Sequence, residues 1–156
     1  MKLLGTPPIN PVLFLIWKAA LVLPFLFLPL AAVHHAQGRL AFPRASPFAL
    51  AAVIVGVELV LWAGRELGAS IRVGLPNEAT VFKTHGLYRY SRNPIYVGVF
   101  VALAGSCVLV PHWLNLTSTS TAVIVHHLIV LGEERFLDAR FGTAWREYRS
   151  HVRRYL

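Results

Sequence analysis

The sequence predicts an all-α integral membrane protein, a bundle of about four transmembrane helices followed by a cytoplasmic amphipathic helix. Of 156 residues, 56% are hydrophobic and 14% are charged, against roughly 25% charged residues in soluble domains. The apolar residues fall into four long stretches, and the basic residues lie between and after them. The length suits one domain, the apolar fraction excludes a disordered chain, and the single cysteine, Cys107, excludes a disulfide framework.

The four predicted transmembrane helices cover residues 11–33, 47–63, 94–110 and 113–132. Each approaches the length of about 20 apolar residues that a membrane-spanning helix needs. The alternative, four core helices of a soluble protein, would leave too few polar residues to cover them. Pro24 and Pro29 predict a kink or a break in the first helix. That stretch is long for a cleavable signal peptide and contains Lys18, so a retained helix is favoured.

The basic residues predict the orientation. Twelve of the fifteen lie at the N-terminus, in the loop 64–93 or in the tail 133–156, and only Arg39 and Arg44 lie on the other side. These twelve are Lys2, Arg65, Arg72, Lys83, Arg89, Arg92, Arg135, Arg140, Arg146, Arg149, Arg153 and Arg154. The positive-inside rule therefore places both termini in the cytoplasm, in a bacterial inner membrane or an ER-type membrane. Because this charge follows a membrane face, no nucleic-acid partner is expected.

The third predicted helix begins at a candidate anion site. Asn93 suits the N-cap, and Pro94 suits the first helical position. Together with Arg89 and Arg92, the exposed N–H groups of this helix start would attract an anion. Gly98 would let another group approach the backbone closely. The alternative is that the arginines only anchor the chain at the membrane surface, and that Gly98 belongs to a helix-packing face of small residues.

Glu133 and Glu134 lie where the fourth predicted helix leaves the membrane. Neighbours on a helix point about 100° apart, so at most one of them faces a given pocket. Such a carboxylate suits a cationic or hydroxyl-bearing ligand, although both may instead be ion-paired with nearby arginines. The histidines lack a metal-ligand spacing, so no metal is expected. Glu58, inside the second predicted helix, is a candidate proton carrier or a partner of Lys18.

The tail carries apolar residues at a spacing of three or four. They are Phe141, Trp145, Tyr148, Val152 and Tyr155. This stripe predicts an amphipathic helix on the cytoplasmic leaflet, separated from the fourth helix by Gly142. The alternative is that the tail folds back to cover a pocket.

Three segments resemble motifs of a known group of enzymes. Residues 82–98 resemble the signature Gly-Pro-Tyr-Arg-Tyr-x-Arg-His-Pro-x-Tyr-x-Gly of the isoprenylcysteine carboxyl methyltransferase and phospholipid methyltransferase families. Residues 133–152 resemble their Glu-Glu-x-x-Leu…Phe-Gly…Tyr…Tyr ending, and residues 61–68 resemble the segment before the signature. The resemblance covers residues 57–156. Leu87 and Asn93 depart from it, because they stand where the signature has Pro and His.

The resemblance implies a membrane methyltransferase that uses S-adenosylmethionine and acts on a lipid-like or isoprenylated acceptor. It implies catalytic roles for Arg89, Arg92 and Asn93. It implies a cofactor site formed by His85, Gly86, Tyr88, Pro94, Tyr96, Gly98, Glu133 and Glu134. Asn93 is no base near neutral pH, which favours a carboxylate acceptor and O-methylation. A small proton-coupled transporter using Glu58 and a catalytically silent membrane scaffold are the alternatives, and the oligomeric state stays open.

Overall fold

The computed structural model describes residues 10–38, 47–68 and 82–156, and this part of the chain is helical apart from turns and one isolated bridge. The helices are α1 (Pro11–Ala36), α2 (Pro47–Leu67), the short 3₁₀ helix η2 (Gly86–Arg89), α3 (Pro94–Leu109), α4 (Trp113–Phe141) and α5 (Thr143–His151). The predicted all-α class is confirmed. Lys2, Arg39, Arg44 and Arg72, which entered the predicted orientation, lie outside the described residues.

Within the described ranges, α2 and α4 are long and apolar enough to cross a membrane. α3 has 16 residues, or about 24 Å at 1.5 Å per residue, which is shorter than a hydrocarbon core of about 30 Å. The count of four transmembrane helices and their orientation therefore stay predictions. α1 runs without a break through Pro24 and Pro29. α4 continues nine residues beyond the predicted end at 132, through both glutamates to Phe141.

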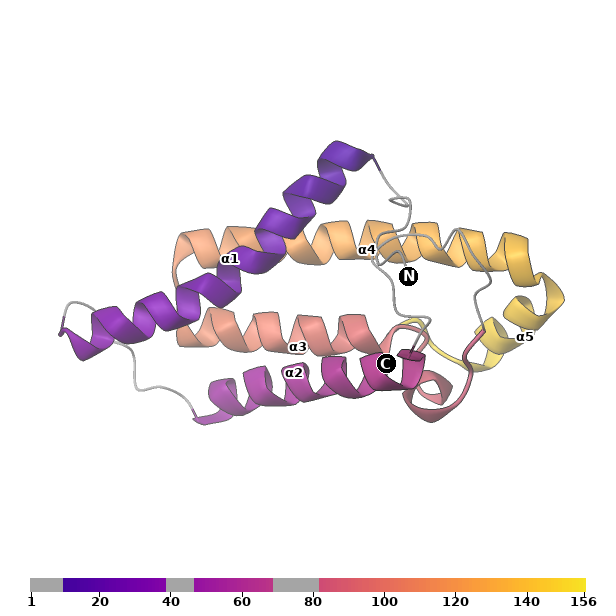
Figure 1. Ribbon diagram of the computed structural model, residues 1–156, viewed down its shortest axis with the longest axis horizontal. Coiled ribbons are helices and arrows are strands. Elements are labelled where there is room, and N and C mark those ends of the chain that lie inside the picture. Colours follow the sequence, from indigo (N-terminus) through magenta and orange to yellow (C-terminus); the bar gives the residue numbers. More distant parts are fainter. Residues whose placement is uncertain (1–9, 39–46, 69–81) are drawn as a thin grey trace.

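Small residues let α2 and α3 pack side by side with their backbones nearly touching (Figure 1). A Cβ atom on Gly98 would lie 2.6 Å from the backbone oxygen of Gly56, and one on Gly105 would lie 2.7 Å from that of Ala49. Any side chain at these glycines would push the helices apart. The predicted small-residue face of α3 thus packs within the chain, on α2.

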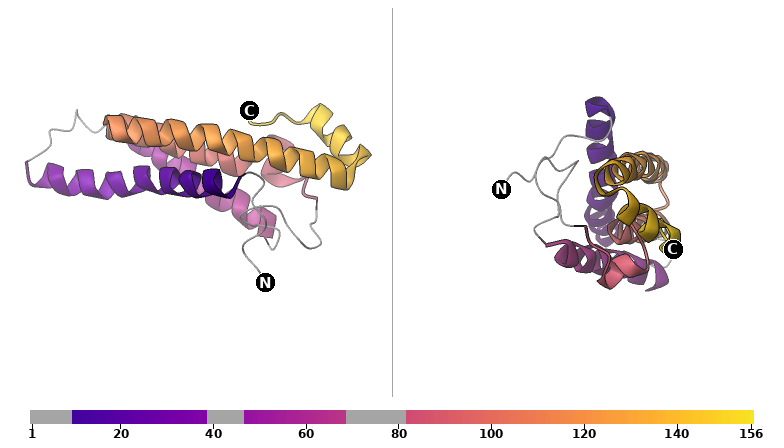
Figure 2. Two further views of the ribbon diagram at one scale, coloured as in Figure 1. Left: turned by 90° about the horizontal axis from the view of Figure 1, so that it is seen from above. Right: turned by 90° about the vertical axis from the view of Figure 1, so that its right-hand side faces the viewer.

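α1 crosses α4 and α3 at an angle and covers one side of the bundle (Figures 1 and 2). Ala20 of α1 packs against Leu103 of α3 and Ala122 of α4 in a small apolar core. Because two of these three residues are alanines, the helices approach closely where α1 crosses.

One end of the bundle gathers the segments that carry the sequence motifs. η2, the start of α3, the end of α4 and α5 all lie there (Figure 1). Gly142 has a φ of +51°, a conformation that favours glycine, and it separates α4 from α5 as predicted. The chain therefore reverses at Gly142, and the last residues return toward the start of α3.

Candidate functional site

A carboxylate on α2 holds the loop that leads into α3. Glu66 Oε2 accepts a hydrogen bond from the backbone N–H of Leu87 at 2.7 Å, at the first turn of η2. Gly86 has a φ of +63°, and a Cβ atom at this position would collide with the Glu66 carboxylate. The glycine of the signature is thus required both by its backbone conformation and by the close approach of Glu66.

The C-terminal tail docks on the segment just before α3. The backbone N–H of Arg92 donates to the carbonyl of Arg153 at 2.9 Å, and Asn93 Nδ2 donates to the carbonyl of Arg154 at 3.0 Å. Asn93 is the N-cap residue of α3 and Pro94 follows it, as predicted, but the Asn93 amide is used in this contact and makes no capping bond. Ser91 Oγ instead accepts a hydrogen bond from the Asn93 N–H at 3.1 Å.

Glu134 is buried between two arginines. Arg154 Nε and Nη2 donate to Glu134 Oε1 and Oε2 at 3.0 and 2.9 Å, a bidentate pair. Arg92 Nη1 lies 3.2 Å from Glu134 Oε1. The hydrogen bonds that Arg154 donates to Glu134 raise the pKa of Arg154, whereas burial lowers the pKa of Arg92 despite the nearby carboxylate. Glu134 thus joins α4, the start of α3 and the tail.

Glu133 faces a different side of α4. Both of its carboxylate oxygens accept from the hydroxyl of Tyr96, at 3.2 and 3.3 Å. The Tyr96 ring in turn packs edge-on against the ring of His126, with centroids 5.0 Å apart. The two adjacent acids therefore contact different partners, as their angular separation on a helix requires.

The aromatic stripe of the tail packs on the loop before α3. Phe82 stacks on Phe141 with centroids 5.1 Å apart and packs edge-on against Trp145 and Tyr148. The Tyr148 hydroxyl donates to the carbonyl of Tyr88 at 2.5 Å. Burial raises the pKa of Tyr148 to about 12. The pKa of Tyr88 is also raised, mainly by burial and to a smaller extent by the negative charge of Glu66. The tail thus folds back, which is the second of the two predicted arrangements.

Two buried side chains near Glu134 have hydrogen-bond donors without an acceptor. Within the described structure, no hydrogen bond is made by Arg92 Nε, Arg92 Nη1 or Trp145 Nε1. The contact of Arg92 Nη1 with Glu134 is an ion pair without hydrogen-bond geometry. The Arg92 side chain is 7% exposed, and its guanidinium lies over the Trp145 ring, 5.5 Å from the centroid. Buried donors of this kind cost about 1–3 kcal/mol each when unpaired, so an incoming oxygen atom would be bound favourably.

The structure brings together most of the residues predicted for the site. Those at the motif end of the bundle are Tyr88, Arg92, Asn93, Pro94, Tyr96, Glu133 and Glu134. Three others are used differently. His85 and Arg89 are exposed, and the Arg89 guanidinium lies over the ring of its neighbour Tyr90. The space beside Gly98 is occupied by the backbone of α2. In the described ranges, no three His, Cys, Asp or Glu side chains are grouped as a metal would need.

Three residues of the site escaped the sequence analysis. Glu66 is the acid that follows the second apolar stretch, and Arg154 was counted only as part of the tail's positive charge. Trp145 was named only as one member of the apolar stripe of the tail, and the structure shows it buried against Phe82 and Arg92. The contact of Glu134 with Arg154 could have been predicted by asking which arginine of the basic tail neutralises Glu134.

The candidate transport residue lies elsewhere. Glu58 is on the exposed face of α2, and the side chain of Lys18 is not among those described. The described geometry therefore does not support a proton path through the bundle at Glu58.

An apolar helical bundle with acids, arginines and tyrosines gathered at one end fits the class of integral membrane methyltransferases. A family model described as phospholipid methyltransferase matches residues 46–144, from the start of α2 into α5. The chain belongs to the phospholipid methyltransferase family, which confirms the resemblance seen in the motifs. Searches of curated proteins and of solved structures gave no significant match.

Proposed function

We propose that the protein transfers a methyl group from S-adenosylmethionine to a lipid-like acceptor at the motif end of the bundle. Membership of the phospholipid methyltransferase family supports methyl transfer in a membrane. The observation that carries the assignment of the site is Arg92, whose buried Nε and Nη1 lack a hydrogen-bond acceptor.

The chemistry of the side chains fits the cofactor. S-adenosylmethionine has a carboxylate, for which the Nε–H of Arg92 and the Nε1–H of Trp145, which lack a hydrogen-bond acceptor, are suited. It also has an ammonium group and ribose hydroxyls, for which the Glu133 carboxylate is suited, since Tyr96 occupies only part of its acceptor capacity. When bound, the cofactor supplies an electrophilic methyl group on a positively charged sulfur.

The chain would contribute binding, positioning and exclusion of water. Tyr96 holds the Glu133 carboxylate in place, and Glu134 holds Arg92 against the tail. Phe82 and Trp145 form an apolar cover beside Arg92, which lowers the local dielectric and strengthens its interaction with an anion. Placing two reactants in a fixed orientation can by itself supply roughly 7–11 kcal/mol of rate enhancement.

The acceptor is proposed to be a phospholipid-like or isoprenylated molecule, with a carboxylate favoured. The Asn93 amide is already hydrogen-bonded to the carbonyl of Arg154 and has no basic atom. An acceptor that is deprotonated at neutral pH needs no base at this position. The membrane would be a bacterial inner membrane or an ER-type membrane. In the predicted orientation both termini lie in the cytoplasm, so the site would face the cytoplasm.

The experiment is calorimetry of the detergent-purified protein with S-adenosylhomocysteine, followed by labelled methyl transfer. Two acceptors are used separately, an aminophospholipid and S-farnesylcysteine. We expect binding, a loss of about tenfold or more in affinity for Glu133→Gln, and no loss for the matched control Glu58→Gln on the exposed face of α2.

The outcomes separate the alternatives. A folded protein that does not bind S-adenosylhomocysteine refutes the proposal. Binding without methyl transfer to either acceptor indicates the catalytically silent scaffold. Proton-driven uptake into liposomes that Glu58→Gln abolishes would indicate the transporter.

A further inference from the structure

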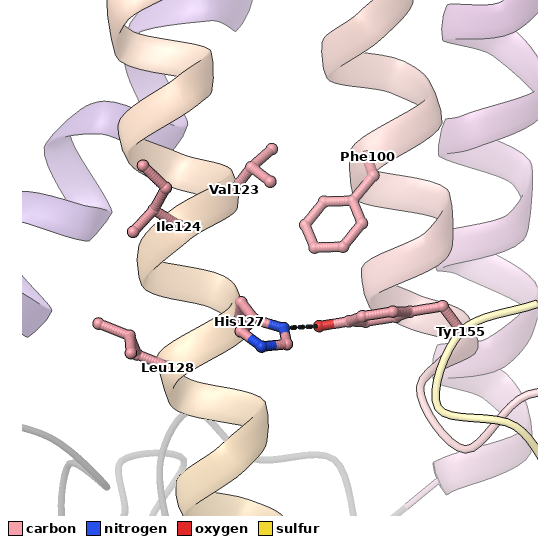
Figure 3. Close-up of a pocket in the computed structure, with 6 residues that line it drawn as sticks. All are labelled: Phe100, Val123, Ile124, His127, Leu128 and Tyr155. Carbon is pink, nitrogen blue, oxygen red and sulfur yellow. Dashed lines mark hydrogen bonds between the residues drawn. The ribbon is translucent and has the colours of Figure 1, made fainter.

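A pocket of about 330 Å³ lies between α3, α4 and the last residues of the tail (Figure 3). Its lining residues are Phe100, Val123, Ile124, His127, Leu128 and Tyr155. Ile124 is 61% exposed, so this wall lies at the outer surface of the bundle. The volume is at the lower end of the roughly 300–1,000 Å³ of small-molecule pockets.

The polar side chains of the pocket are paired with each other. The Tyr155 hydroxyl and His127 Nδ1 are 2.9 Å apart and point toward one another across the pocket (Figure 3). Val123 and Ile124 precede His127 on α4, whereas Glu133 follows it six residues later, about 9 Å along the helix. The His127–Tyr155 pair is therefore at the end of the pocket nearer to the proposed cofactor site.

Aromatic contacts connect the pocket to Glu133. Phe100 packs edge-on against both Tyr155 and His126, with centroids 5.4 and 5.8 Å apart. His126 contacts the Tyr96 ring, and the Tyr96 hydroxyl donates to Glu133. A continuous series of packed side chains, Phe100, His126 and Tyr96, therefore links the pocket wall to Glu133.

We propose that this pocket binds one linear apolar chain of the methyl acceptor, acyl or isoprenyl, and that the His127–Tyr155 pair contacts the polar group where that chain begins. This inference rests on the proposed function, because it takes Glu133 to mark the cofactor side. A lipid chain would enter from the exposed side, past Ile124, without leaving an apolar surrounding. With the pair intact, one donor remains, either the Tyr155 O–H or the other N–H of the His127 ring. That donor can bond an ester or carboxylate oxygen, which would direct the polar end of the acceptor toward Glu133.

The tail would couple the two sites. Arg154 pairs with Glu134, and the next residue, Tyr155, forms a wall of the pocket. Docking of the tail therefore completes both the charged cluster and the pocket.

The test is photo-crosslinking in lipid nanodiscs with two probes. One is an aminophospholipid with a diazirine in the middle of an acyl chain, and the other is S-farnesylcysteine with a diazirine in the isoprenyl chain. Labelling is mapped by mass spectrometry and needs no cofactor. We expect labels at residues 123–128 and at Phe100. The probe that labels these residues more strongly identifies the type of chain. Labels spread evenly over the exposed faces of α2 and α4 would overturn the proposal.

Variants test the role of the pocket in turnover. Val123→Trp fills the pocket, and Val55→Trp on the exposed face of α2 is its matched control. We expect Val123→Trp to reduce labelling and raise the acceptor KM by about tenfold, and Tyr155→Phe to raise the acceptor KM with unchanged kcat. Affinity for S-adenosylhomocysteine should stay within about twofold of the wild type. Equal effects of the two tryptophan variants would contradict the inference, whereas a wild type that labels in the pocket but binds no S-adenosylhomocysteine would contradict only the proposed function.

Discussion

Glu134 is predicted to stabilise the motif end of the bundle, and Glu134→Gln tests this with almost no change in shape. The variant removes the negative charge between Arg154, bound at 3.0 and 2.9 Å, and Arg92, at 3.2 Å. Breaking a buried ion pair costs roughly 3–5 kcal/mol. The Arg154 side chain is 31% exposed and is partly screened by solvent, so we expect a loss near the lower end, about 3 kcal/mol.

The assay is denaturant unfolding in detergent micelles, followed by tryptophan fluorescence, since Trp145 contacts Arg92. The matched control is Asp138→Asn, which breaks the exposed pair with Arg146, whose side chains are 42% and 69% exposed. Exposed pairs are worth about 0–1 kcal/mol, so this variant should be nearly neutral. Equal, small losses for Glu134→Gln and Asp138→Asn would refute the reasoning.

Three further predictions concern the elements around the site. Glu66→Ala should remove about 1–2 kcal/mol of stability and speed hydrogen exchange at the Leu87 amide, because that N–H loses its acceptor. Gly98→Ala should cost about 1–3 kcal/mol in thermal unfolding, because its Cβ would meet the backbone of α2, whereas Ala104→Val on the exposed face of α3 should be nearly neutral. Tyr148, whose folded pKa is raised from 10.0 to about 12, contributes stability that is complete below pH 10 and is lost as the pH rises through 12. Tyr148→Phe should flatten this part of a stability–pH profile.

The local sequence pattern predicted the helices well, because apolar stretches and helix-ending glycines determine structure through neighbouring residues. The start of α3 at Pro94 and the break at Gly142 follow from the conformational preferences of those residues. The end of α4 was placed nine residues too early, at the first pair of charges. Within the part of α4 that continues, Glu134 is paired with arginines that are distant in sequence, and no local pattern reports this pairing.

The composition of the candidate site was predicted better than the partners of its residues. Motif order indicated that the start of α3 and the two glutamates would meet, and the structure brings them together through Tyr96 and Arg92. The role of each acid depended on the rotation of α4, which tertiary packing determines. The exposure of Arg89 could not be predicted either, because the sequence around an arginine does not show whether its side chain faces inward or outward.

The departure of Asn93 from the family signature has a structural explanation in the tail. A residue at this position meets the carbonyl of Arg154, so it must donate a hydrogen bond, and an asparagine amide donates as a protonated or correctly oriented histidine ring would. The same contact holds Arg154 beside Glu134 and Tyr155 beside His127. The side chain at position 93 therefore positions the tail that closes both the charged cluster and the apolar pocket. If this docking is what the signature residue supplies, asparagine preserves it while removing a basic atom from the site, and methyl transfer would then depend on an acceptor that needs no base.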